Sequence, residues 1–215
     1  MTAFSSPSFS STSFSKLMGS QTLLPIIQAD SVEQGVNIAK AMAASGLKLV
    51  EVVLRTAEAL EALMAIKQQV PELLVGAGTV VNDTLLQQAI DAGADFIVTP
   101  AVSEKLLAAL AVCGTPVLPG VSNTADILMA REFGFTELKL FPAELSGGAP
   151  FLSAISTVFQ DISFCPTGGV TAQNKEEYLS LNNVIAIGGT WVCRKEWVVN
   201  EDWQAITDAC TQAIN

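Results

Sequence analysis

Apolar, β-branched runs alternate with segments of helical periodicity from about residue 23 to the end of the chain. This alternation predicts strands that are each followed by a helix. The first and last strands start at residues 23 and 184, so the mean step is (184 − 23)/7 = 23 residues, the length of one compact βα unit. The predicted strands are Leu23–Gln28, Leu49–Leu54, Leu73–Gly76, Asp95–Val98, Thr115–Leu118, Glu137–Leu140, Ile162–Cys165 and Val184–Ile187.

Capping residues and helix breakers bound the segments between these strands. Asp83 and Ser103 are suitable N-caps, and Gly46, Gly93 and Gly114 each follow a periodic segment. The predicted helices are Ser31–Ser45, Ala57–Gln69, Asp83–Ala92, Ser103–Val112, Asn123–Phe133, Pro150–Phe159, Thr171–Ser180 and Asp202–Ile214.

Eight strand–helix units have two main solutions, a closed (β/α)₈ barrel and an open doubly wound sheet. The even spacing, the lack of an early G-x-G-x-x-G and the glycine-rich turns after the last two strands favour the barrel. We therefore predict an α/β fold, a single-domain (β/α)₈ TIM barrel over residues 21–215. Residues 1–20 are predicted to be an N-terminal extension that includes the start of a short helix, around Phe14 to Ser20.

The N-terminal stretch Met1 to Ser15 is rich in Ser and Phe and carries no charge. It lacks the basic region and the continuous apolar core of a secretory signal, and no apolar run in the chain reaches transmembrane length. We interpret it as a loose tail. The alternative is a docking segment that uses Phe4, Phe9 and Phe14.

Composition narrows the possible partners and cofactors. Hydrophobic residues make up 50% of the 215 residues, as in a globular chain, and the net charge of −10 argues against binding to nucleic acid or to an anionic membrane. The chain has no histidine, and none of its four cysteines forms a C-x-x-C pair, so a zinc site is not expected. We predict small buried thiols in a reducing cytoplasm.

Lys139 is the most informative residue. It lies in an apolar predicted strand that ends at Pro142, and burial disfavours the ammonium form of a lysine. An uncharged amine can attack a carbonyl and form a Schiff base, so Lys139 is a candidate covalent catalyst. The alternative is a lysine that extends to solvent at the strand end.

Glu51 is the candidate partner of Lys139. It is flanked by apolar residues in the second predicted strand, and alternation places Glu51, Val53 and Arg55 on one face. If this face points into a barrel, Glu51 and Lys139 would pair, and each would shift the pKa of the other. The alternative is a structural ion pair or an outward polar face, but helices cover the outside of a barrel and would bury an outward glutamate too.

Three glycine clusters are predicted to follow strands. They are Gly76–Thr79, Gly168–Gly169 and Gly188–Thr190. Paired glycines let the backbone approach an oxyanion, and the following helix presents free N–H groups. Two pairs after the last two strands indicate a phosphate site, although glycines often only turn a chain.

These residues together resemble the bacterial 2-dehydro-3-deoxy-6-phosphogluconate / 4-hydroxy-2-oxoglutarate aldolases. The resemblance covers about residues 20 to 213, and its segments are collinear with those of the family. The matching segments are Val50–Thr56, Val75–Val80, Leu118–Ser122, Lys139–Glu144, Phe164–Gly169 and Ile187–Trp191.

The resemblance implies a class I aldolase on a (β/α)₈ barrel, a cytoplasmic homotrimer in most cases, without a metal or another cofactor. Lys139 matches the family's Schiff-base lysine and Glu51 its general acid/base. The family's substrate-binding positions match Arg55, Thr79, Pro100, Phe141, Gly168, Gly169, Gly189 and Thr190. Arg55, Thr79 and Phe141 correspond to the pyruvyl end of the substrate, and the last four to the phosphate end.

Two positions depart from the family. Thr190 stands where serine is frequent and keeps a hydroxyl. Ala101 replaces the glycine expected in Ser-Pro-Gly, which is expected to change the path of the loop that holds Pro100. The expected reaction is cleavage of a 2-oxo acid to pyruvate and an aldehyde. The alternatives are a phosphosugar isomerase or epimerase, against which the lack of histidine counts, and a barrel that binds a phosphorylated acid without turnover.

Overall fold

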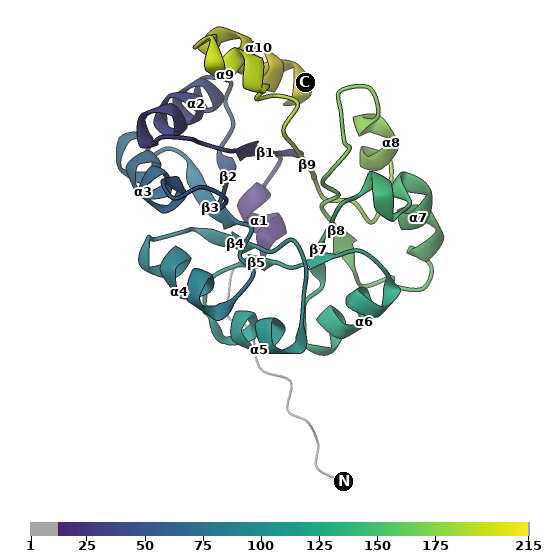
Figure 1. The fold of residues 1–215 in the computed structure, drawn as a ribbon. Helices are drawn as coiled ribbons and strands as arrows, with labels where there is room; N and C mark the ends of the chain where they lie inside the picture. Colours follow the sequence, from purple (N-terminus) through teal and green to yellow (C-terminus); the bar gives the residue numbers. More distant parts are fainter. Residues whose placement is uncertain (1–12, 215) are drawn as a thin grey trace.

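The computed structural model describes residues 13–214 as an α/β fold in which a curled parallel sheet is covered by helices on its outer face (Figure 1). One sheet has the strand order β5-β4-β3-β2-β1-β9, and the other has the order β6-β7-β8. The strands are β1 Leu23–Ile27, β2 Leu49–Val53, β3 Leu74–Gly78, β4 Phe96–Val98, β5 Val117–Leu118, β6 Gly120–Val121, β7 Glu137–Leu140, β8 Ser163–Phe164 and β9 Ile187–Gly189.

The helices lie around the outside of this sheet, except for α1, which lies at its centre in the view of Figure 1. Within residues 13–214, no helix is long and apolar enough to cross a membrane. The helices are α1 Phe14–Met18, α2 Val32–Ala44, α3 Ala59–Gln69, α4 Asp83–Asp91, α5 Glu104–Val112, α6 Thr124–Glu132, η1 Glu144–Ser146, α7 Gly148–Ile155, α8 Lys175–Leu179, α9 Lys195–Val199 and α10 Trp203–Ile214.

Hydrogen bonds connect the two sheets at both of their edges. Pro119 separates β5 from β6 and donates no backbone N–H, but its carbonyl accepts from the N–H of Lys139 at 2.8 Å. At the other edge, isolated parallel bridges join Phe164 to Val184 and Thr167 to Gly188. The strand predicted at Thr115–Leu118 is thus observed as β5, and a second short strand, β6, follows it after Pro119.

Several predicted boundaries are wrong where glycine occupies a strand. β3 continues to Gly78 instead of ending at Gly76, and β9 is Ile187–Gly189 instead of Val184–Ile187. Glycine has a low strand propensity, so the pattern placed these residues in turns, whereas neighbouring side chains fill the space beside them. The short helix α9 was not predicted, and the helix predicted at Pro150–Phe159 is Gly148–Ile155.

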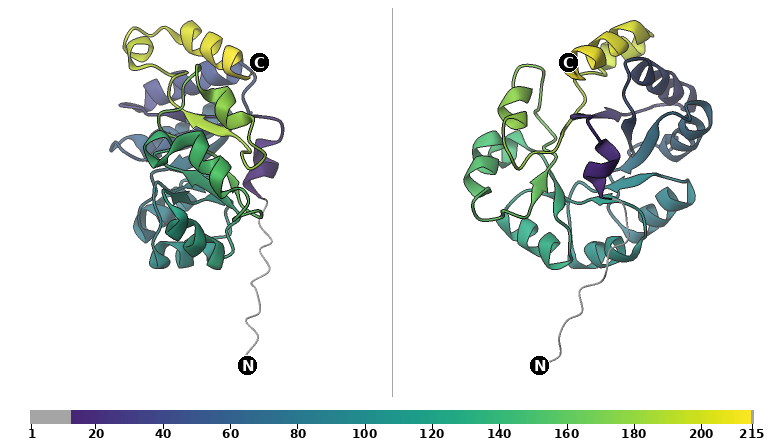
Figure 2. Two further views of the ribbon diagram at one scale, coloured as in Figure 1. Left: turned by 90° about the vertical axis from the view of Figure 1, so that its right-hand side faces the viewer. Right: turned by 180° about the vertical axis from the view of Figure 1, so that it is seen from behind.

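The predicted N-terminal helix closes one end of the curled sheet. The N–H groups of Phe14 and Ser15 donate to the carboxylate of Glu137 at 2.6 and 3.2 Å, and Glu137 is the first residue of β7. The Phe14 ring meets the Phe96 ring edge-on, with centroids 5.4 Å apart. Figure 2 shows α1 at the end of the sheet, and Glu137 identifies this as the end where the strands begin.

The burial of Phe14 bears on the docking alternative for the N-terminal segment. Phe14 is 1% exposed and belongs to a core cluster inside the sheet, so its ring is occupied within its own chain. Phe4 and Phe9 lie outside the described residues.

We predict that Phe14→Ala lowers the free energy of unfolding by about 3–5 kcal/mol, because it removes a buried ring and leaves a cavity against Phe96. Urea unfolding followed by circular dichroism measures the change. Val112→Ala is the control, since Val112 is 83% exposed and should unfold as the parent chain does. An unchanged midpoint for Phe14→Ala would contradict the inferred role of α1 as part of the core.

Candidate functional site

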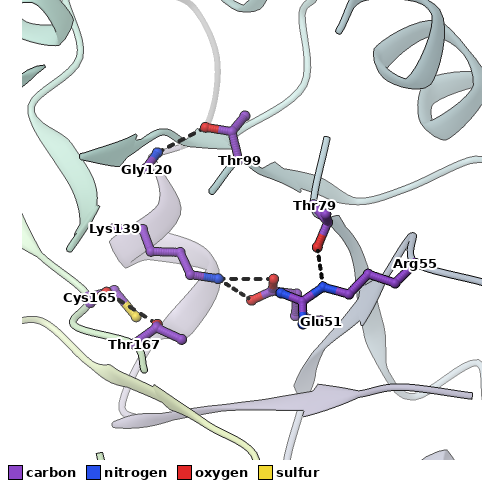
Figure 3. A network of polar contacts seen from close by, with 8 residues as sticks. All are labelled: Glu51, Arg55, Thr79, Thr99, Gly120, Lys139, Cys165 and Thr167. Atoms are coloured by element: carbon purple, nitrogen blue, oxygen red, sulfur yellow. Dashed lines mark hydrogen bonds and ion pairs between the residues drawn. The ribbon is translucent and has the colours of Figure 1, made fainter. Parts of the chain in front are cut away.

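A buried ion pair lies inside the curled sheet. The Nζ of Lys139 on β7 is 3.1 and 3.2 Å from the two carboxylate oxygens of Glu51 on β2 (Figure 3). The Lys139 side chain is 6% exposed and that of Glu51 is 0% exposed. The predicted pairing of these two residues is confirmed.

Strand alternation explains why both side chains point inward. Leu49, two residues before Glu51, packs in the interior cluster with Phe14, so Glu51 shares its face. Glu137, two residues before Lys139, contacts α1 at the end of the same interior. Glu51 and Lys139 each lie two residues after a residue that faces the interior, and alternation along the strand therefore points them inward as well.

Gly78 leaves the space that the Glu51 carboxylate occupies. A Cβ atom added to Gly78 would lie 2.1 Å from Oε1 of Glu51. Gly76 is explained in the same way, since its Cβ would lie 2.1 Å from the Phe96 ring. The glycines predicted to follow the third strand thus lie within β3 and make room for a carboxylate and an aromatic ring.

The pair is chemically suited to amine catalysis. Both charges are removed from water, and each is compensated by the other, because an isolated buried charge would cost several kcal/mol. The amine of Lys139 must lose a proton before it can attack a carbonyl, and Glu51 is an acceptor within hydrogen-bond distance.

Arg55 and Thr79 lie where β2 and β3 end. The Nε of Arg55 donates to Oγ1 of Thr79 at 3.1 Å, and Arg55 is exposed. Thr79 has a left-handed backbone with φ +64°, a conformation that costs about 1–2 kcal/mol for a residue with a Cβ. The structure thus brings together two of the residues assigned to the pyruvyl end, with a hydroxyl held by a strained backbone.

Phe141 directly follows β7, the strand of Lys139, and Pro100 lies in the loop after β4. The Phe141 ring centroid lies 5.5 Å from Nζ of Lys139, within reach of a cation–π contact. The Pro100 backbone approaches β6 so closely that a Cβ on Gly120 would lie 2.8 Å from its carbonyl oxygen. Among residues 13–214, the left-handed non-glycine residues are Thr79 and Glu201, so Ala101 does not impose that strain on the loop.

Cys165 and Thr167 follow β8 and also lie in the interior (Figure 3). Burial raises the pKa of the Cys165 thiol to about 12, while Lys139 acts in the opposite direction and Glu51 adds to the rise. The thiol therefore stays protonated near neutral pH and does not compete with the amine as a nucleophile. The Thr167 side chain was not predicted as part of the site, and it is 3% exposed.

The glycine pairs after β8 and within β9 differ in what surrounds them. Gly168 and Gly169 are left-handed, with φ +95° and +85°. At Gly189, an added Cβ would lie 1.7 Å from the Trp191 indole, so this glycine is required by an aromatic neighbour. Thr190 is exposed and borders a cavity of about 500 Å³ together with Trp191 and Arg194.

Contacts between β9 and the loop after β8 place the two glycine pairs side by side. Thr167 bridges to Gly188, whose N–H donates to the Pro166 carbonyl at 2.8 Å.

Within residues 13–214, no group of three or more His, Cys, Asp and Glu side chains is placed to hold a metal ion. The sequence did not show that Gly78 would make room for Glu51 or that Thr167 would fill the space beside Gly188, since only the folded neighbours reveal this.

Comparisons with known proteins agree with this geometry. The sequence model of one family, described as KDPG and KHG aldolase, matches residues 15–209. A KHG/KDPG aldolase of Escherichia coli K12 is 37% identical over 203 residues, which is 94% of this chain and 95% of the relative.

Two solved structures are similar over most of their length. A KDPG aldolase from Legionella pneumophila, with pyruvate captured as a covalent carbinolamine, is 36% identical with a TM-score of 0.90, over 93% of this chain and 97% of that one. A 2-keto-3-deoxy-6-phosphogluconate aldolase of Zymomonas mobilis with 3-phosphoglycerate is 36% identical with a TM-score of 0.84, over 92% and 93%. The chain belongs to the KDPG and KHG aldolase family.

Proposed function

We propose that this protein is a class I aldolase that cleaves a 2-oxo acid to pyruvate and an aldehyde through a Schiff base on Lys139. The observation that carries the proposal is the buried contact between the Lys139 amine and the Glu51 carboxylate, at 3.1 and 3.2 Å. The enzyme class also rests on the family, whose members are named as aldolases.

The proposed reaction begins when the Lys139 amine attacks the C2 ketone. Glu51, directly or through one water, takes the amine proton and delivers a proton to the departing hydroxyl, so that water leaves and a protonated imine forms. The C4 hydroxyl then loses its proton, the C3–C4 bond breaks, and its electrons move into the iminium. The products of this step are an aldehyde and an enamine, which is protonated at C3 and hydrolysed to pyruvate and the free amine.

Residues near the pair are proposed to hold the substrate. The residues proposed to border the pyruvyl end are Arg55, Thr79, Pro100 and Phe141. The cationic guanidinium of Arg55 suits the carboxylate of a 2-oxo acid, the Thr79 hydroxyl is held in place, and the Phe141 ring lies near Nζ of Lys139. Gly168, Gly169, Gly189 and Thr190 would border the phosphate end. The left-handed glycines of the loop after β8 support this, since such backbone presents N–H groups to an anion.

Two substrates are proposed from the names of the relatives. For 2-dehydro-3-deoxy-6-phosphogluconate the aldehyde is glyceraldehyde 3-phosphate, and for 4-hydroxy-2-oxoglutarate it is glyoxylate. The first reaction belongs to the Entner–Doudoroff pathway. The Escherichia coli relative carries both substrates in its name.

The fold and the location have finer descriptions that we also propose. Two bridges, Phe164 to Val184 and Thr167 to Gly188, and the hydrogen bond from the Lys139 N–H to the Pro119 carbonyl support closure of the sheet into one eight-stranded (β/α)₈ barrel. We propose residues 21–215 as a single domain. The free thiols of Cys113, Cys165, Cys193 and Cys210 support a cytoplasmic location.

A homotrimer is proposed from the family resemblance. Light scattering coupled to gel filtration is expected to give about three times the 22.6 kDa mass of one chain. A peak at the mass of one chain at every concentration would refute the trimer and leave the catalytic proposal untouched.

Two other functions remain as alternatives, an isomerase or epimerase acting on a phosphosugar and a barrel that binds a phosphorylated acid. A binder does not need the Lys139–Glu51 pair, whose burial would be a cost without a purpose. An assay that couples pyruvate formation to lactate dehydrogenase separates the three functions, because only the aldolase releases pyruvate from a 2-oxo acid substrate.

We predict that borohydride added with pyruvate traps a covalent adduct on Lys139. The amine loses water with the ketone, and hydride reduces the resulting iminium to a stable secondary amine, so the intact mass rises by pyruvate plus two hydrogens minus one water. Lys139→Met should not be labelled. Lys67→Met is the control, since Lys67 pairs with Asp95 on the outer part of the fold, and it should be labelled fully. Labelling of another lysine would refute the assignment.

We predict that Glu51→Gln and Gly78→Ala each lower kcat by about 10²–10⁴, because the first removes the proton acceptor and the second displaces it. The double variant should be little worse than either one, since both changes remove the same group. Gly35→Ala in α2 is the control for added methyl groups, and thermal melting reports the folded fraction. Normal turnover in folded Glu51→Gln would remove Glu51 from the mechanism.

A further inference from the structure

Glu144 contacts the Gly168–Gly169 loop through its backbone and through its side chain. Its backbone N–H donates to the Gly168 carbonyl at 3.0 Å. Its side chain fills the space beside Gly169, where an added Cβ would lie 2.2 Å from Cγ of Glu144. The loop therefore rests on the first residue of η1, which follows the strand of Lys139.

Two side chains from the α8 region complete this support. The Oε1 atom of Glu144 accepts hydrogen bonds from the Tyr178 hydroxyl and, at 3.3 Å, from Nδ2 of Asn174. The same Nδ2 donates to the Gly169 carbonyl at 3.1 Å, and Oδ1 of Asn174 accepts from the Thr171 N–H at 2.7 Å. We refer to Glu144, Asn174 and Tyr178 as the brace.

The brace has a physical reason to exist. Two consecutive left-handed glycines have many other backbone conformations, so holding them in one conformation costs conformational entropy. Tyr178 is 0% exposed, and a buried hydroxyl without a partner would be destabilising. Burial, followed by the neighbouring Glu144 carboxylate, raises the pKa of Tyr178, so its hydroxyl remains a proton donor.

We propose that Glu144, Asn174 and Tyr178 are positioning residues that hold the Gly168–Gly169 loop ready for the phosphate of the substrate, and that they thereby set the preference for phosphorylated over unphosphorylated 2-oxo acids. The proposal rests on the proposed aldolase function. The side-chain hydrogen bonds of the brace run to Gly169, to Thr171 and among its own members, whereas the amine chemistry is proposed to take place between β2 and β7.

The kinetic test uses Tyr178→Phe, which keeps the buried ring and removes one hydroxyl. We expect KM for 2-dehydro-3-deoxy-6-phosphogluconate to rise about tenfold, the effect of one lost hydrogen bond on a phosphate-binding loop. The kcat and KM for 4-hydroxy-2-oxoglutarate should not change, nor should borohydride trapping of pyruvate. Ser180→Ala is the matched control, because its exposed hydroxyl bonds to Glu177 near the end of the same helix. An equal loss on both substrates would indicate a general structural role and overturn the proposal.

Two Glu144 variants separate the geometry of the brace from its charge. Glu144→Gln keeps an oxygen that can accept from Tyr178 and should retain the preference for the phosphorylated acid. Glu144→Ala removes the acceptor and the packing against Gly169 and should lose this preference. The same preference in both variants as in the parent chain would contradict the proposal.

Titration with inorganic phosphate, followed by calorimetry, tests the brace without turnover. The dissociation constant is expected to rise about tenfold in Tyr178→Phe. If that variant does not fold, Asn174→Ala replaces it, with Asn183→Ala as the control for a lost amide that bonds elsewhere, to the Leu152 carbonyl. Unchanged phosphate affinity overturns the brace. Absence of pyruvate formation and of trapping in the parent chain would instead overturn the aldolase function, while the phosphate result still decides the brace.

Discussion

The buried ion pair between Lys139 and Glu51 is the interaction on which the rest of this structure depends. The two residues are 88 positions apart in the sequence, on β2 and β7, and they meet only because the parallel sheet curls until these strands face each other. Neither charge could be buried without the other, since each alone would cost several kcal/mol. The fold therefore supplies a reactive amine together with its proton acceptor, and a flat sheet would supply neither.

Two residues near the pair, Gly78 and Thr79, are unfavourable for the stability of β3. Gly78 weakens a central strand so that a carboxylate fits beside it, and Thr79 adopts a left-handed backbone that a β-branched residue avoids. Gly78 lies beside the Glu51 carboxylate, and Thr79 accepts a hydrogen bond from Arg55. Strain and missing side chains at neighbouring positions are therefore explained better by the geometry of the site than by the needs of the core.

The sequence predicted the order of strands and helices and the Lys139–Glu51 pair, because alternation along each strand indicates which side chains share a face. It failed where a residue's role depends on which side chain packs against it. The pattern gave no sign that the Trp191 indole would fill the space beside Gly189, or that Glu51 would lie against Gly78. Strand ends were misplaced for the same reason, since glycine is a poor strand former unless a neighbour fills the space.

The two ends of the proposed site differ in structure, because one consists of side chains on strands and the other of loop backbone. The reacting end consists of buried side chains on strands, which neighbouring strands fix on both sides. The other end consists of loop backbone at Gly168 and Gly169, which is held by side chains from η1 and α8 rather than by strand pairing. If the loop holds the phosphate as proposed, substitutions of the side chains that support it change which substrate is held and leave the amine and its acceptor in place. Under this proposal, recognition of the phosphate and bond cleavage are separable, because only the Lys139–Glu51 pair is positioned directly by strand pairing.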